Sequence, residues 1–206
     1  APVAISDDWV YIRSVEILLR EGHFEILTVA SANLLFQVLW GALFGVLFGP
    51  SLGVFRLSVT VLWLLSALAG YGLLLQLTGD RARSALGTAI YAFNPLGYSL
   101  AFSFMTDAPF VALLVIAVWC YARGLGREEE DTRWIFAGSL ASACAILVRQ
   151  PGVFIPAAAV LATLIDGRFR DLDAPGDRRL QRTQIIGRLD KDEMHRRGSD
   201  QQGPGA

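Results

Sequence analysis

The chain has 206 residues, of which 53% are hydrophobic, and a formal net charge of −1. Its mean hydropathy of +0.45 comes with near-continuous apolar runs, a combination that argues against a soluble domain. Cys120 and Cys144 both lie inside apolar runs, so we expect buried side chains and neither a disulfide framework nor a metal site. The sequence has no phosphate-binding glycine loop, nucleophile elbow or nucleic-acid patch, and we expect no nucleic-acid partner.

The first expected element is an amphipathic helix from Trp9 to Arg20, ended by Gly22. Its two faces are Arg13, Glu16 and Arg20 against Trp9, Ile12, Val15 and Leu19. Tryptophan and arginine together suit a helix that lies on a membrane surface. The next apolar stretch, Leu34 to Phe48, is short for a span of about 20 residues, so it either crosses the bilayer or lies in its interface.

Five further apolar stretches follow. Leu57 to Leu77 carries no charge and, at about 1.5 Å per residue, reaches about 30 Å, the thickness of the hydrocarbon core. The others are Ala85 to Met105, which Asn94-Pro95 interrupts, then Ala108 to Ala122, Trp134 to Val148 and Gly152 to Ile165. We therefore expect an all-α polytopic membrane protein with about five transmembrane helices and one or two interfacial amphipathic helices.

Composition divides the chain into three parts. Residues 1–53 read as an outer loop with juxtamembrane helices, residues 54–166 as a transmembrane helical module, and residues 167–206 as a disordered polar tail. The chain opens on a loop sequence rather than a span, so we expect it to be a fragment of a longer protein.

Loop charges predict the orientation. Arginines gather in the loops that flank alternate spans (Arg81 and Arg83, then Arg123, Arg127 and Arg133, then Arg168 and Arg170). The positive-inside rule places these loops in the cytoplasm, with Asp107 and Arg149 outside. Asp7 and Asp8 share the outer side if Leu34 to Phe48 lies in the interface, and are cytoplasmic if it crosses. Its length and glycines favour the interface, and hence a multi-pass inner-membrane protein with its active side outside the cytoplasm.

Asp7 and Asp8 are the first candidates for chemistry, because adjacent carboxylates are unfavourable near a membrane and seldom occur there without a function. One interpretation is a solvated loop in which one aspartate caps the following helix. The other is a general base beside a charged or metal partner, which leaves a divalent metal at Asp7 and Asp8 as an open expectation.

Three further residues lie at the ends of expected spans. Asp107 precedes Pro109 and fits a helix cap, a role that is compatible with a site residue. Arg149 in "VRQPG" and Arg56 either extend to lipid headgroups or hold a lipid phosphate by paired hydrogen bonds.

Four segments resemble one family when they are read in order. They are "DDWVYIRSVEILLREG", "LFQVLWGALFGVLFGPSLGVFRLS", "AFNPLGYSLAFSFMTDAPF" and "WIFAGSLASACAILVRQPG". They resemble the N-terminal module of GT-C glycosyltransferases, closest to family 39, which includes protein O-mannosyltransferases and the aminoarabinose transferase that acts on lipid A. The chain departs from that pattern at "ASANL", where many members carry a "KPP"-like motif.

The resemblance implies a function and roles for the candidates. Members use polyprenyl-phosphate sugars as donors, and the first aspartate of the pair acts at the acceptor. Asp7 would then be the base, Asp8 its partner and Asp107 the family's later outer acid, with Arg149 and Arg56 as candidates for binding the donor phosphate. Surface helices after the pair would make Leu34 to Phe48 juxtamembrane.

The sequence therefore predicts a membrane glycosyltransferase fragment that transfers a sugar from a polyprenyl-phosphate donor to a lipid, glycan or protein acceptor outside the cytoplasm. The rival hypotheses are a transporter or lipid-handling protein, and an inactive remnant of a truncated gene. Transporters tend to place ionisable residues at the membrane midplane. Here the acids lie at span ends or in loops, and only Asn94-Pro95 favours the transporter.

Overall fold

The structure, a computed structural model, describes residues 8–24, 33–126 and 131–165, and these residues form helices and short connections without strands. The helices are α1 (Asp8–Glu21), α2 (Leu35–Phe48), α3 (Leu52–Thr78), α4 (Arg81–Ala92), α5 (Pro95–Ala101), α6 (Asp107–Leu125) and α7 (Thr132–Val148), followed by the 3-10 turn η1 (Gln150–Val153). The expected all-α fold is confirmed. The polar tail predicted for residues 167–206 lies outside the described residues.

The chain divides into two compact units, Ala1–Ala159 and Val160–Ala206, and the helices above belong to the first. Two of them, α3 and α6, are long and apolar enough to cross a membrane. Shorter apolar helices are Leu35–Phe48, Thr132–Val148 and Gln150–Ile165. This set agrees with the expected partial membrane module.

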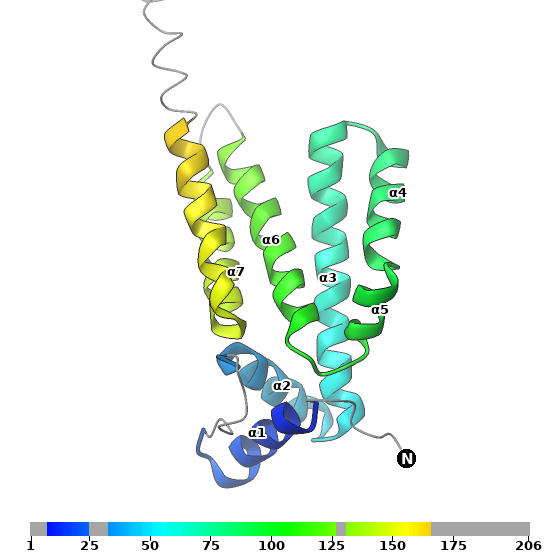
Figure 1. Cartoon of the computed structure of the whole chain (residues 1–206), viewed down its shortest axis with the longest axis vertical. Helices are drawn as coiled ribbons and strands as arrows, with labels where there is room; N and C mark the ends of the chain where they lie inside the picture. The colour runs from blue at the N-terminus through cyan, green and yellow to red at the C-terminus, as the bar shows by residue number, and fades with distance from the viewer. Residues whose placement is uncertain (1–7, 25–32, 127–130, 166–206) are drawn as a thin grey trace, which may run out of the picture. The chain divides into compact units, whose positions relative to one another are not determined.

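Close approaches between α3 and α6 depend on a glycine. A Cβ atom on Gly72 of α3 would lie 2.6 Å from Nε1 of Trp119 on α6, so only glycine leaves room for this indole. Near the C-terminal ends of both helices, Nε2 of Gln76 donates to the carbonyl oxygen of Ala122 at 2.8 Å. The two helices therefore run in the same direction and finish at the same end of the first unit (Figure 1).

The end where α3 and α6 finish also carries four of the loop arginines, namely Arg81, Arg83, Arg123 and Arg133. Arg123 of α6 stacks on Trp134 of α7 and on Trp119, with its guanidinium carbon 4.6 and 5.8 Å from the two ring centroids. Cations over aromatic faces are attracted by the ring quadrupole. This stack joins α6 to α7 at the end of the unit that is rich in arginine.

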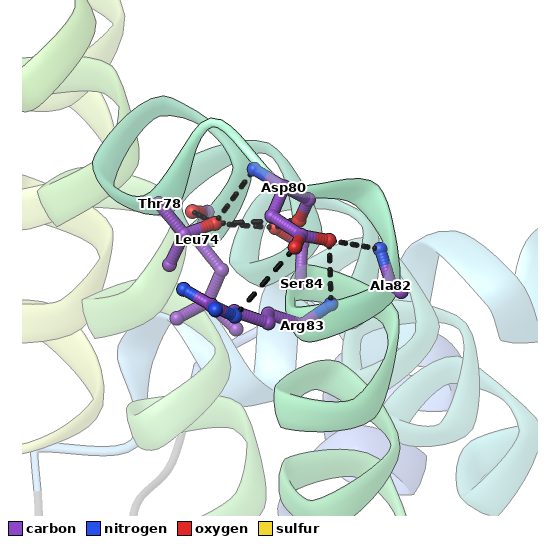
Figure 2. Close-up of polar contacts among 6 residues, drawn as sticks. All are labelled: Leu74, Thr78, Asp80, Ala82, Arg83 and Ser84. Atoms are coloured by element: carbon purple, nitrogen blue, oxygen red, sulfur yellow. Dashed lines mark hydrogen bonds and ion pairs between the residues drawn. The ribbon is translucent and has the colours of Figure 1, made fainter.

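The turn from α3 to α4 is closed by polar contacts (Figure 2). Gly79 adopts a positive φ of 66°, which glycine allows without strain, and ends α3. Asp80 then caps α4 by accepting from the N–H groups of Ala82 and Arg83 at 2.8 and 3.1 Å. Ser84 Oγ donates back to the Asp80 carbonyl oxygen at 2.7 Å, and the Arg83 guanidinium lies 3.6 Å from the Asp80 carboxylate. Arg83 is thus tied to its own turn.

The predicted interruption at Asn94-Pro95 is confirmed. Helix α4 stops at Ala92, and α5 starts at Pro95, whose missing N–H is not needed at the first position of a helix. Asn94 Oδ1 accepts from the N–H groups of Leu96 and Gly97 at 3.1 and 3.2 Å. The break is therefore a capped corner between two helices.

Helix α2 contacts the N-terminal part of α3 and the segment that leads into α6. Trp40 Nε1 donates to the carbonyl oxygen of Ser58 at 2.9 Å. A Cβ on Gly41 would lie 2.6 Å from Cζ of Phe104, so glycine allows the helix to approach this buried ring. Figure 1 shows α2 across this end of the unit rather than alongside the full length of α3. That placement favours the interfacial alternative for Leu34 to Phe48.

Helix α1 matches its expected extent, and Gly22 ends it with a φ of 71°. Its buried face differs from the expected one. Val15 is fully buried, but Trp9, expected on the same face, is 55% exposed. Val10 and Tyr11 are buried in its place. The difference arises because Asp8, at the start of the helix, faces the core and turns Trp9 outward.

Candidate active site

Asp8 is a fully buried carboxylate with two partners. Its Oδ1 accepts from the backbone N–H of Phe104 at 3.1 Å, and its Oδ2 lies 3.2 Å from Nη2 of Arg56 on α3. The Arg56 side chain is 20% exposed, whereas Asp8 is 0% exposed. A carboxylate without water is stable only when its charge is paired and its oxygen atoms accept hydrogen bonds. Asp8 thereby joins α1 to α3 and to the segment before α6.

Phe104 is held from two sides. While its N–H donates to Asp8, its carbonyl oxygen accepts from Nε2 of Gln37 on α2 at 3.3 Å. Its ring is fully buried and packs against Phe55, with 5.7 Å between the ring centroids. Buried backbone groups in a loop need such side-chain partners, because no helix ladder supplies them. The start of α6 is consequently fixed by α1 and α2.

Asp107 and Arg149 form the second acid–arginine pair. Asp107 opens α6, where a carboxylate is favoured by the helix dipole, and its Oδ1 accepts from Nη1 of Arg149. Arg149 follows α7, and its N–H donates to the carbonyl oxygen of Ala145 at 2.9 Å. The two side chains are 41% and 40% exposed. Unlike Asp8, this pair is accessible to a ligand.

The turn after Arg149 is tight. The N–H of Gly152 donates to the carbonyl oxygen of Arg149 at 3.0 Å. A Cβ atom on Gly152 would lie 2.6 Å from the backbone nitrogen of Ile146, so the "RQPG" turn requires glycine for close approach. The direction in which Arg149 leaves α7 depends on this turn.

The two pairs share one end of the first unit. The backbone N–H of Phe104 donates to Asp8, and Phe104 precedes Asp107 by three residues. The Cα atoms of Phe104 and Asp107 are therefore at most about 11 Å apart. Both pairs lie at the N-terminal ends of α3 and α6 and the C-terminal end of α7. This is the end opposite to the Arg83 turn and the Arg123 stack (Figure 1).

The described side chains do not make a metal site. Within residues 8–24, 33–126 and 131–165, no three His, Cys, Asp or Glu side chains are grouped to hold an ion. Both oxygen atoms of Asp8 are engaged by Phe104 and Arg56. The expected role of Asp7 with Asp8 at a metal stays a prediction, because Asp7 lies outside the described residues.

The structure brings together four of the five predicted site residues as two pairs, Asp8 with Arg56 and Asp107 with Arg149. Arg56 is paired with Asp8, and its predicted contact with a donor phosphate stays a prediction. Sequence reasoning missed Gln37. Its signal was a lone amide in the otherwise apolar helix "LFQVLWGALFGVLF".

Apolar helices of membrane-spanning length, with two acid–arginine pairs gathered at one helical end, define a membrane protein with a charged site at that end. The family model described as dolichyl-phosphate-mannose-protein mannosyltransferase matches residues 36–175, and the chain belongs to this family of GT-C membrane glycosyltransferases. Arg56, Asp107 and Arg149 lie within the matched residues, and Asp8 precedes them. No curated protein and no solved structure matches the chain.

Proposed function

We propose that the chain contributes the acceptor and donor-phosphate side of a sugar-transfer site on the extracytoplasmic face of the cytoplasmic membrane. The donor is a polyprenyl-phosphate-linked sugar, and the acceptor is a hydroxyl of a lipid, glycan or protein. One observation carries the proposal: an accessible Asp107–Arg149 pair beside a buried carboxylate that follows Asp7 directly.

The two pairs suit different tasks because their exposure differs. Asp8 is enclosed and fully engaged, which suits a residue that fixes the chain on which Asp7 is carried. Arg149 is partly exposed and forms its ion pair through Nη1. A guanidinium has five N–H donors in a fork that matches phosphate oxygens, so Arg149 can bind a phosphate while it remains beside Asp107.

In the proposed reaction, the carboxylate of Asp7 takes the proton of the acceptor hydroxyl. The hydroxyl oxygen forms a bond to the anomeric carbon of the sugar as the bond from that carbon to the phosphate oxygen breaks. The electron pair of that bond leaves with the polyprenyl phosphate, whose developing negative charge is stabilised by Arg149.

Transfer assays with variants test the assignment. The assay uses the chain in its membrane, a polyprenyl-phosphate-mannose probe and hydroxyl acceptors. Asp7→Asn should lower kcat by about 100-fold or more, the usual contribution of a general base, with donor binding unchanged. Arg149→Gln should raise KM for the donor. Arg83→Gln is the matched control, because Arg83 pairs with Asp80 in the turn at the opposite end.

Two results would contradict the proposal. Unchanged transfer by Asp7→Asn would show that another group takes the proton. Equal effects of Arg149→Gln and Arg83→Gln on donor binding would show that charge in general, rather than the outer pair, attracts the donor. Movement of the lipid-linked sugar across the bilayer without transfer would favour the transporter.

A further inference from the structure

The residue pair Asn33 and Gln37 lies where α2 begins, and the first of the two reaches the end of α7. Asn33 Nδ2 donates to the carbonyl oxygen of Ile146 at 3.0 Å. Ile146 belongs to the last turn of α7, where carbonyl groups lack partners within the helix. It precedes Arg149 by three residues, so the Asn33 amide is attached to the helical turn from which Arg149 extends.

Gln37 reaches the segment that carries the acid of the same ion pair. Its Nε2 donates to the carbonyl oxygen of Phe104, three residues before Asp107. The side chain is fully buried, and its Oε1 has no hydrogen-bond partner among the residues that the structure describes. An unpartnered buried acceptor destabilises a fold, and an apolar side chain of the same size would avoid it.

The backbone between the two amides is also strained. Leu34 adopts φ 54° and ψ −9°, a left-handed conformation that is unfavourable for a residue with a Cβ atom. Its side chain is fully buried, and its carbonyl oxygen accepts from the N–H of Val38 at 2.9 Å. Strain and unpaired polar groups tend to gather where geometry serves a function.

We infer that Asn33 and Gln37 are positioning residues that determine how the Asp107 carboxylate and the Arg149 guanidinium meet. Each amide holds one of the two segments, and the two residues are four apart in the chain, with Asn33 just before Leu34 and Gln37 in the first turn of α2. The inference rests on the proposed function for its role in donor binding. The placement itself can be measured without sugar transfer.

Gln37→Met separates this role from a merely structural one. Methionine keeps the length of the side chain and removes the unpaired Oε1, which offsets the cost of leaving the Phe104 carbonyl oxygen without its donor, so the melting temperature should change little. The hydrogen bond to Phe104 is lost, so Asp107 should shift against Arg149. Asn33→Ala makes the same test from the α7 side. Donor kcat/KM should fall by about 10- to 100-fold, as for a displacement of about 1 Å at a reacting centre.

Placement is read by chemical cross-linking. Asp107→Cys and Arg149→Cys are introduced together after the native Cys120 and Cys144 are changed to alanine, and a methanethiosulfonate cross-linker of fixed reach joins them. Gln37→Met and Asn33→Ala should each slow cross-linking several-fold. Trp40→Phe is the matched control, because it also removes an α2 side chain's hydrogen bond to backbone, but on α3 at Ser58.

The outcomes separate the two proposals. Unchanged cross-linking in both amide variants overturns the inference, whatever the donor does. If Gln37→Met clearly lowers the melting temperature as well as the rate of cross-linking, the inference is also overturned, because Gln37 would then only support the fold. Slower cross-linking at unchanged stability supports it. If cross-linking is slower but the unsubstituted protein binds no polyprenyl phosphate, the positioning role stands and the proposed function fails.

Discussion

Removal of the Asp8 carboxylate should destabilise the protein strongly. Asp8→Ala takes a fully buried charge away from Arg56 and leaves the Phe104 N–H without its acceptor. Loss of one partner from a buried pair costs about 3–5 kcal/mol. The Arg56 side chain is 20% exposed, so its charge is not fully buried after Asp8 is removed. We therefore expect the free energy of unfolding to fall by the lower end of this range, about 3 kcal/mol.

Thermal unfolding in detergent measures this change. At about 2–4 °C per kcal/mol for a chain of this size, Asp8→Ala should lower Tm by about 6–12 °C. Arg56→Met should be comparably harmful, because it leaves the buried carboxylate unpaired. The double variant should be less harmful than the sum of the two, since it removes both charges. If the Tm changes of Asp8→Ala and Arg56→Met simply added in the double variant, Asp8 and Arg56 would not stabilise each other as a buried ion pair. A Tm change below about 2 °C for Asp8→Ala would refute the pair as well.

Asp107→Ala is the matched comparison for this prediction. Its pair with Arg149 is 41% and 40% exposed, and exposed ion pairs contribute at most about 1 kcal/mol. We therefore expect a Tm change of no more than about 2–4 °C. If the exposed pair mattered as much to stability as the buried one, burial would not be what distinguishes their roles.

Four further substitutions test the local geometry by the same Tm measurement. Gly152→Ala brings a Cβ to 2.6 Å from the α7 backbone, and strain of this kind should cost about 1–3 kcal/mol and weaken donor binding. Gly41→Ala pushes against the enclosed Phe104 ring and should cost a similar amount, whereas Gly53→Ala, with nothing within 4 Å, should leave Tm unchanged or raised. Asp80→Ala removes the α4 cap and should cost about 1 kcal/mol.

Local signals in the sequence predicted the helices well, because hydropathy and capping act over a few residues. The run from Leu57 to Leu77 lies within α3, and Asn94-Pro95 marks a real helix end. Asp107 was expected to cap the helix that contains Pro109, but the N-cap position is Thr106 and Asp107 is the first residue of α6. The side chain of Asp107 also binds Arg149, which capping arguments alone do not indicate.

The partners of the buried groups could not be predicted in the same way. Asp8 and Phe104 are 96 residues apart in the chain, and Gln37 and Phe104 are 67 apart. Such contacts depend on how α1 and α2 pack across helix ends, which no periodicity records. Charge counting placed Arg149 and Asp107 on one side but gave no reason for Arg56 to pair with Asp8 instead of a phosphate.

The burial of Asp8 bears on which of the two adjacent carboxylates, Asp7 or Asp8, acts as the general base. A base must lie within hydrogen-bond reach of the hydroxyl it deprotonates and must have an oxygen atom free to accept. Asp8 is 0% exposed and both oxygen atoms are engaged, so an acceptor reaches it only if the Arg56 or Phe104 contact opens. We therefore propose Asp7 as the base, with Asp8 fixing the chain beside it. Asp8→Asn separates the alternatives: as a support it should lower Tm and kcat together, whereas as the base it should lower kcat at unchanged Tm.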